Sequence, residues 1–210
     1  MQGLLIVISG FSGVGKGTIV KELLKRYPEN FALSISATTR KPREGEVDGR
    51  EYFFLTKKAF QGLIREDALI EHAVYNGNYY GTPRQYVQDM LDQGKNVILE
   101  IEMQGGLQIK AKYPETLLLY VVPPNAGELY RRLTKRGTET KEEILKRLRR
   151  GVDETAYITM YDALTVNDDL DACVEEVREL IEKQQKTVTE RREFAKVLHD
   201  ELLKLTEEVE

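Results

Sequence analysis

The residues best suited to chemistry lie near the start of the chain, in a glycine-rich loop that ends in a lysine and a threonine. Glycines let the backbone turn tightly, so several N–H groups can point into one concavity that accepts phosphate. A lysine there adds a full positive charge for the terminal phosphates of a nucleotide. We therefore predict that the whole loop binds a nucleoside triphosphate: Gly10, Phe11, Ser12, Gly13, Val14, Gly15, Lys16, Gly17 and Thr18.

A second group of residues is suited to binding another phosphate. Arg40 and Arg43 are three residues apart beside a proline, and a guanidinium group can hold two phosphate oxygens at once. Glycines and tyrosines follow at 45–52 and 77–82, with Glu71 between these stretches. Each stretch alone is typical of a surface loop. In this order after a phosphate loop, they predict a site for a second anionic ligand.

Two carboxylates lie at the end of a predicted strand. Glu100 and Glu102 are two residues apart, so on a strand both side chains point to one face. Ligands of open α/β sheets bind at the carboxyl ends of the strands. The two side chains therefore face the predicted site, where they can reach a base, a ribose or a water molecule bound to Mg²⁺.

Charge is divided unevenly over the second half of the chain. Residues 128–150 hold nine Lys/Arg against four Asp/Glu, whereas residues 162–210 hold fifteen Asp/Glu against seven Lys/Arg. A solvated helix face explains the acidic stretch. The basic stretch is compatible with a charged surface helix, but we favour a mobile lid that closes over a triphosphate.

These side chains need elements to hold them in place. Residues 4–8, 97–101 and 117–122 are almost continuously apolar, which indicates buried parallel strands. Residues 16–26 carry apolar side chains at helical spacing. Strands that alternate with helices predict an α/β fold of three layers around a parallel sheet. Residues 36–82 do not follow this alternation of strands and helices. Their pattern predicts a small, partly antiparallel insertion.

The composition argues against several classes of protein. A single cysteine, Cys173, allows neither an internal disulfide nor a thiolate metal cluster, and the two histidines are too far apart to suggest a zinc site. The net charge of −4 argues against a nucleic-acid partner held by bulk charge. With no membrane-length apolar run and no basic leader, we expect no membrane partner and a cytoplasmic location.

In its motifs the chain resembles the guanylate kinase family, from about residue 4 to about residue 185. The order of the motifs is more specific than any one of them. After the phosphate loop they are SATTRKPR at 36–43, GEVDGREY at 45–52, GNYYGT at 77–82, MQG at 103–105, RGTET at 136–140 and VNDD at 166–169.

The resemblance implies a P-loop three-layer fold and an enzyme that transfers the γ-phosphoryl group of ATP to GMP, and to dGMP, with Mg²⁺. It implies a kinase domain over 1–187, with a core at 1–35, 83–128 and 162–187. A mixed α/β GMP-binding insertion at 36–82 and a helical lid at 129–161 complete that domain. Residues 188–210 exceed the usual family length and are expected to form a helical extension.

The resemblance also assigns roles, residue by residue. The residues implied to bind GMP are Ser36, Arg40, Arg43, Tyr52, Glu71, Tyr80, Thr82 and Glu100. Those implied to surround the transferred phosphoryl group are Lys16, Arg132, Arg136 and Arg147, with Asn167 near the adenine. Gly17 stands where a hydroxyl residue usually meets Mg²⁺, so Thr18 and Glu102, the latter through water, are the expected metal contacts.

Other functions stay open at this point. The alternatives are a kinase for another nucleoside monophosphate, a scaffold module that binds phosphopeptides without catalysis, and a nucleic-acid-stimulated ATPase. Such scaffold modules tend to lose the lysine and lid arginines that this chain keeps.

The end of the chain carries a separate pattern. Apolar residues recur every three or four positions from Leu170 to Val209, with Gln184 and Arg191 at the two polar positions. This is a heptad pattern. It predicts either a long helix that lies back on its own domain or a coiled coil between two copies, so the chain is expected to be a monomer or a homodimer.

Overall fold

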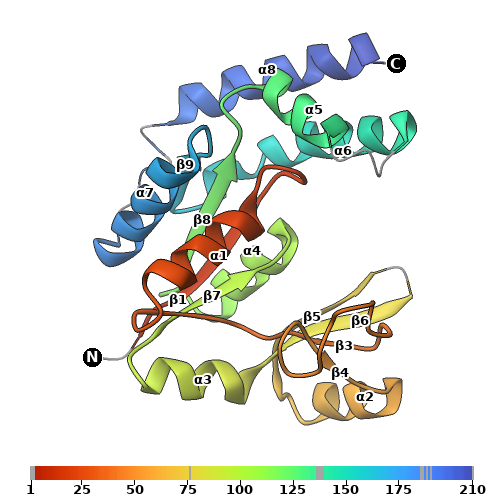
Figure 1. The fold of residues 1–210 in the computed structure, drawn as a ribbon, viewed down its shortest axis with the longest axis vertical. Coiled ribbons are helices and arrows are strands. Elements are labelled where there is room, and N and C mark those ends of the chain that lie inside the picture. The colour runs from red at the N-terminus through yellow and green to blue at the C-terminus, as the bar shows by residue number, and fades with distance from the viewer. Residues whose placement is uncertain are drawn as a thin grey trace.

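The structure is a computed structural model that describes residues 3–75, 77–135, 140–184, 187, 189 and 191–209. Its centre is a five-stranded sheet in the order β2-β7-β1-β8-β9, and every pair of neighbours is parallel (Figure 1). The strands are β1 (Leu5–Gly10), β2 (Phe31–Leu33), β7 (Asn96–Glu100), β8 (Leu117–Val122) and β9 (Ala163–Val166).

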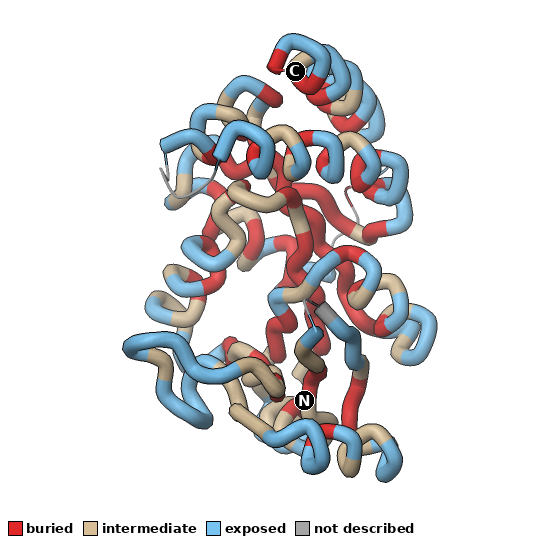
Figure 2. The backbone as a smooth tube through the Cα atoms, turned by 90° about the vertical axis from the view of Figure 1, so that its right-hand side faces the viewer, coloured by how far each residue is buried: buried red, intermediate tan, exposed pale blue. Residues whose placement is uncertain are grey.

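The strand sequences explain this arrangement. All six residues of β8 are buried, and so are the three aliphatic residues of β7. Strands covered on both faces lose the apolar–polar alternation of half-exposed strands. In Figure 2 the buried residues follow these strands through the middle of the molecule. The predicted strand at 117–122 is confirmed with the same bounds.

Helices cover both faces of this sheet. Helix α1 (Lys16–Arg26) leads from β1 to β2, and α4 (Met103–Lys112) leads from β7 to β8. The two connections run in opposite directions along the sheet, so right-handed crossovers place their helices on opposite faces. Helix α7 (Leu170–Glu182) packs beside α1. The predicted three-layer α/β fold is confirmed, and the helix expected at 16–26 has the same bounds.

A second sheet interrupts the core between β2 and β7. Its order is β4-β3-β6-β5, with β3 and β4 parallel and the other neighbours antiparallel. It consists of β3 (Ala37–Thr38), β4 (Phe53–Phe54), β5 (Leu69–Tyr75) and β6 (Asn78–Pro83), with helix α2 (Lys57–Arg65) packed on it through Phe60. Helix α3 (Arg84–Asp92) returns the chain to the core.

Two helices separate β8 from β9. They are α5 (Ala126–Lys135) and α6 (Lys141–Thr155), followed by a single 3₁₀ turn, Ile158–Met160. Helix α6 begins with a capping box, in which the Thr140 side chain accepts from the Glu143 N–H and Glu143 accepts from Thr140 N–H. No helix in the described part of the chain is both long and apolar enough to span a membrane.

The heptad pattern at the end of the chain does not form one helix. Helix α7 ends at Glu182, Gln184 adopts a positive φ of 47°, and helix α8 (Arg192–Val209) starts afresh. Between them the Thr187 hydroxyl accepts from Leu164 N–H, which ties the chain to β9. The expectation of one long helix over this pattern is therefore wrong. The chain turns between α7 and α8, where Thr187 contacts Leu164 of β9.

Candidate active site

The phosphate loop connects β1 to α1 as its sequence predicts. Gly13 and Gly15 have φ values of 89° and 100°, in the left-handed region that favours glycine. Gly15 caps α1, so the helix N-terminus opens directly onto the loop. The Lys16 ammonium group bends back over the loop and donates to the carbonyl oxygens of Gly10 at 2.5 Å and Phe11 at 3.2 Å. The lysine and the loop backbone are thus held close together at the N-terminus of α1.

Three side chains from distant elements converge on this loop. Arg132 on α5 donates to the Val14 carbonyl oxygen at 3.2 Å, and the Asn167 amide, just after β9, donates to the same oxygen at 2.7 Å. Arg147 on α6 donates to the Ser12 hydroxyl. The fold thus brings together three of the residues that the resemblance placed around ATP. Arg136 lies outside the described residues.

Gly15 is also required by packing. A Cβ atom at this position would lie 2.6 Å from the Asn167 amide nitrogen, far inside van der Waals contact. A side chain at position 15 would displace the Asn167 amide, so the present contact of Asn167 with Val14 favours glycine at this position.

Carboxylates surround the lysine. Burial lowers the pKa of Lys16, while the negative charges of Glu102 and Glu100 act in the opposite direction. Burial raises the pKa of Glu100, which Lys16 partly offsets. A Cβ atom on Gly17 would lie 3.5 Å from a Glu100 oxygen, so this carboxylate lies beside the first turn of α1. The site therefore combines a phosphate loop with acidic groups at its edge.

Glu102 belongs to a network that was not predicted from the sequence. It forms an ion pair with Arg150 on α6, and Arg150 also pairs with Glu154 at 2.9 Å. The buried Glu154 carboxylate accepts a hydrogen bond from Tyr120 on β8 at 2.9 Å. Arg150 and Glu154 are one and two turns beyond Arg147 on α6, but the spacing alone does not show which charged face of this helix points inward.

A second cationic cluster lies on the small sheet. The Arg40 guanidinium carbon is 5.4 Å from the centre of the Tyr52 ring, and the Tyr52 and Tyr80 rings are 6.2 Å apart. Arg40 pairs with Glu46 at 2.8 Å, and the other oxygen of Glu46 accepts from the Arg43 backbone N–H at 2.7 Å. Glu46, which was not predicted as a site residue, neutralises Arg40 and holds the loop that carries Arg43.

Glu71 and Thr82 face each other on β5 and β6. The Thr82 hydroxyl donates to a Glu71 oxygen at 2.8 Å, and burial raises the pKa of Glu71. A Cβ atom on Gly105 would lie 3.8 Å from the other Glu71 oxygen, so the first turn of α4 adjoins this carboxylate. Ser36, which precedes β3, is half-buried, and its carbonyl oxygen accepts from Phe53 N–H at 2.9 Å.

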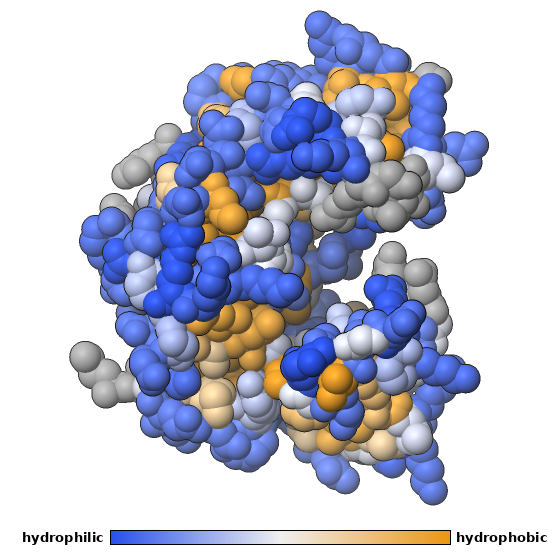
Figure 3. Space-filling model, in the orientation of Figure 1, coloured by the Kyte–Doolittle hydropathy of each residue, from blue (hydrophilic) through white to orange (hydrophobic). Residues whose placement is uncertain are grey.

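The two clusters lie on opposite sides of a hollow. Figure 3 shows the molecule indented between its upper helical part and the small sheet at the lower right. The phosphate loop, Arg132, Arg147 and Asn167 belong to the upper side, whereas Arg40, Tyr52 and Tyr80 belong to the small sheet. Glu100, at the end of β7, is next to the phosphate loop through its register with Ile8 on β1. Two anionic ligands bound at these clusters would face each other across the indentation.

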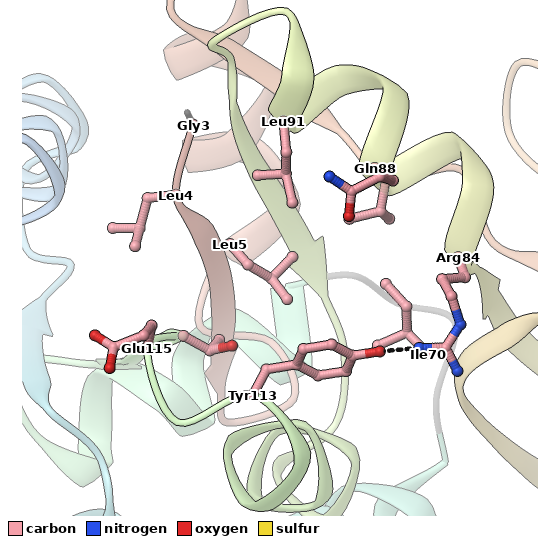
Figure 4. A pocket seen from close by; sticks show the side chains of 11 residues that line it. Gly3, Leu4, Leu5, Ile70, Arg84, Gln88, Leu91, Tyr113 and Glu115 are labelled. Atoms are coloured by element: carbon pink, nitrogen blue, oxygen red, sulfur yellow. Dashed lines mark hydrogen bonds between the residues drawn. The ribbon is translucent and has the colours of Figure 1, made fainter. Parts of the chain in front are cut away.

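A cavity of about 290 Å³ lies away from these clusters, where α3 meets the starts of β1 and β8 (Figure 4). Arg84, on its wall, donates to the Tyr113 hydroxyl and to the Asp67 carboxylate. These contacts fasten the return helix of the small sheet to the core. None of the predicted site residues that the structure describes lines this cavity.

Comparison with known proteins identifies close relatives. A family model described as guanylate kinase matches residues 2–184. The chain is 49% identical over 180 residues to a guanylate kinase of Caldanaerobacter subterraneus subsp. tengcongensis, which covers 86% of this chain and 87% of the relative. It is 47% identical over 184 residues to a guanylate kinase of Clostridium tetani, with 88% of each chain covered.

A solved structure agrees with the sequence relatives. The crystal structure of guanylate kinase from Anaplasma phagocytophilum superposes with a TM-score of 0.68 at 28% identity. The match covers 88% of this chain and 87% of that one. Helix α8 lies outside the residues that the family model matches.

Proposed function

The chain belongs to the guanylate kinase family of ATP:GMP phosphotransferases, and we propose that it moves the γ-phosphoryl group of ATP directly to the phosphate of GMP or dGMP. The products are ADP and GDP or dGDP. The convergence of Arg132, Arg147 and Asn167 on the phosphate loop, across the indentation from Arg40, Tyr52 and Tyr80, carries this proposal.

Guanine is selected by the Glu71 carboxylate. Guanine presents its N1–H and its exocyclic amine side by side, and one carboxylate accepts both, whereas adenine has no such pair. Ser36 and Thr82 supply hydroxyl groups for the base. We also assign Glu100, which lies beside the first turn of α1, to the acceptor. A base that left the Glu71 carboxylate without partners would bind more weakly by about 1–3 kcal/mol.

The phosphate of GMP binds to Arg40, Arg43, Tyr52 and Tyr80. The two arginines supply charge, and the tyrosine hydroxyls supply further donors. Arg40 already lies against the Tyr52 ring, and its guanidinium is shared with Glu46. The incoming phosphate therefore exchanges with a carboxylate that holds the arginine in position.

Transfer needs no general base, because the attacking phosphate oxygen is already anionic. The contribution of the protein is positioning and charge stabilisation around the transferred group. We assign this role to Lys16, Arg132, Arg136 and Arg147. Arginines held over ATP by these helices would exclude water from the transferred group and so suppress hydrolysis.

The residues fit an Mg²⁺ ion that takes most of its ligands from phosphate. In the described part of the chain, no group of three acidic, histidine or cysteine side chains could hold a metal alone. Mg²⁺ commonly binds through one or two carboxylates together with substrate phosphates. Thr18 and Glu102 are the residues we assign to it, with Glu100 adjoining. When bound, the ion neutralises charge on the phosphate oxygens.

The decisive test measures ADP formation from ATP with each of GMP, dGMP, AMP, CMP and UMP, and without an acceptor. We expect rapid turnover with GMP and dGMP alone. Turnover with a different monophosphate would identify another nucleoside monophosphate kinase. Absence of turnover with every acceptor would favour a non-catalytic binding module and would contradict the proposal.

The remaining assignments concern the cellular setting. We propose a cytoplasmic enzyme whose partners are small nucleotides. Its single cysteine, Cys173, is buried, and burial raises the pKa of the thiol to about 11. A thiol protonated at neutral pH and shielded from solvent has low reactivity, so we assign Cys173 no part in the reaction.

A further inference from the structure

Helix α8 packs across the two helices that carry Arg132 and Arg147. It contacts both α6 and α5 (Figure 1). The residues of α8 that are buried at this contact recur at helical spacing: Ala195, Leu198, Leu202, Thr206 and Val209. An apolar stripe of this kind stabilises helix packing. Because the family match ends at residue 184, this helix is additional to the part of the chain that defines the family.

One polar contact joins α8 to the start of α5. A Glu201 carboxylate oxygen accepts a hydrogen bond from the Ala126 N–H at 2.9 Å. Ala126 is the first residue of α5, and Asn125 accepts from the Glu128 N–H at 2.8 Å in the same turn. The first N–H groups of a helix have no partner within the helix, and a negative charge there also interacts favourably with the helix dipole. Glu201 therefore anchors the helix that carries Arg132.

Leu202 of α8 and Phe11 of the phosphate loop lie close to the same glycine of α6, Gly151. Leu202 is fully buried. A methyl group built on Gly151 of α6 would lie 3.7 Å from a Leu202 methyl carbon and 3.6 Å from the Phe11 ring. Gly151, one turn from Arg147, is therefore close to both Leu202 of α8 and the loop residue Phe11. Interiors packed this closely transmit small displacements.

A third contact lies at the end of α6. The His199 Nδ1 atom and the Thr155 hydroxyl are 2.6 Å apart. Thr155 is the last residue of α6. Helix α8 therefore contacts α5 at its first residue and α6 in its second half.

We propose that Glu201 and Leu202 are positioning residues for phosphoryl transfer. They hold α5 and α6 where Arg132 and Arg147 reach the phosphate loop. The inference rests on the proposed function of those arginines. A displacement of roughly 1 Å in a reacting site can reduce the rate about 10²-fold, so a smaller shift of two arginines is expected to reduce kcat about tenfold.

The test compares four single variants of the full chain. Glu201→Ala and Leu202→Ala remove the two contacts. Glu207→Ala and Leu203→Ala are matched controls on the same helix, since Glu207 is exposed and the Leu203 residue is 45% exposed. We expect kcat to fall about tenfold in the first pair, with little change in the affinity for GMP measured by calorimetry. The controls are expected to match the parent.

Two further measurements separate positioning from general destabilisation. Kinetics are measured at a temperature well below the midpoint of thermal unfolding of each variant. Glu201→Gln, which keeps an acceptor oxygen, is expected to retain most of the activity of the parent. Hydrogen exchange of the Ala126 amide is expected to be faster in Glu201→Ala than in the parent.

Several outcomes would overturn the proposal. Parent-like kcat in a folded Glu201→Ala variant would do so, even if Leu202→Ala failed to fold. An unchanged exchange rate of the Ala126 amide in Glu201→Ala would show that Glu201 does not anchor α5. A parent chain that made no ADP from ATP and GMP would contradict the proposed function instead, and the exchange measurement would still decide whether α8 anchors α5.

Discussion

Among single residues, Glu71 has an environment that alters its protonation. Burial raises the pKa of its carboxyl group, although the Thr82 hydroxyl donates to it. If the ionised form binds guanine, affinity for GMP is fully present above the raised pKa. It is then lost as the pH falls through that pKa, because a protonated carboxyl cannot accept both guanine donors. Below the pKa the affinity is expected to fall about tenfold per pH unit.

Calorimetric titration of GMP from pH 8 to pH 5 checks this expectation. The phosphate of GMP titrates within the same range, so Glu71→Gln, which leaves that phosphate unchanged, is the control. We expect the variant to bind weakly at every pH and to show only the phosphate effect. If the affinity for GMP changed with pH in the same way in the parent and the variant, Glu71 would not be responsible for the pH dependence.

Arg147 provides the second residue-scale prediction. Arg147→Ala is expected to lower kcat about 10²–10³-fold, the loss typical of removing one charge-stabilising donor, with little change in GMP affinity. Its contact with the Ser12 hydroxyl places it on the phosphate loop, away from the small sheet. Lys146→Ala, at the exposed neighbouring position, is the control. Steady-state kinetics with a saturating amount of each substrate would reveal the difference, and equal kcat values would exclude the role.

The residues that could be predicted share one property. The phosphate loop is a local motif, so its geometry follows from a few adjacent glycines and a lysine. Glu46, Arg150 and Glu154 could not be predicted in the same way. Each is one charge among several on a loop or helix, and only the packed fold determines which of them turns inward.

At the scale of elements, α6 is tied to the core by a buried hydrogen bond. The Tyr120 hydroxyl donates to Glu154, and burial together with this carboxylate raises the pKa of the tyrosine. Tyr120→Phe leaves one carboxylate oxygen without its donor. We expect the free energy of unfolding to fall by about 1–3 kcal/mol, measured by chemical denaturation. Tyr157→Phe, at a position 45% exposed, is the control, and equal losses would contradict this explanation.

The elements differ in how far the sequence predicts them. Helix α1 and strand β8 have the expected bounds because their signals are local, namely apolar spacing and a continuous apolar run. The break between α7 and α8 has no such signal. It depends on Thr187 reaching Leu164, a contact between residues far apart in the chain, which interrupts a heptad pattern that otherwise continues.

For the whole molecule, the packing of α8 bears on the oligomeric state. Its apolar stripe is covered by α5 and α6 of the same chain. The residues that would form a coiled coil with a second copy are therefore already buried. We expect a monomer of 24.1 kDa in light scattering of the full chain. A mass of twice that value, restored to the monomer by removal of residues 188–210, would instead indicate a dimer through the tail.

The ion pair between Arg40 and Glu46 has a consequence for selectivity among anions. Because the arginine already has a carboxylate partner, a chloride or acetate ion that entered would only replace one single negative charge with another. A phosphomonoester carries nearly two charges and three oxygens at neutral pH, so it gains by the exchange where a singly charged anion does not. An internal competitor of this kind would therefore favour the phosphate of a nucleotide over chloride and other singly charged anions.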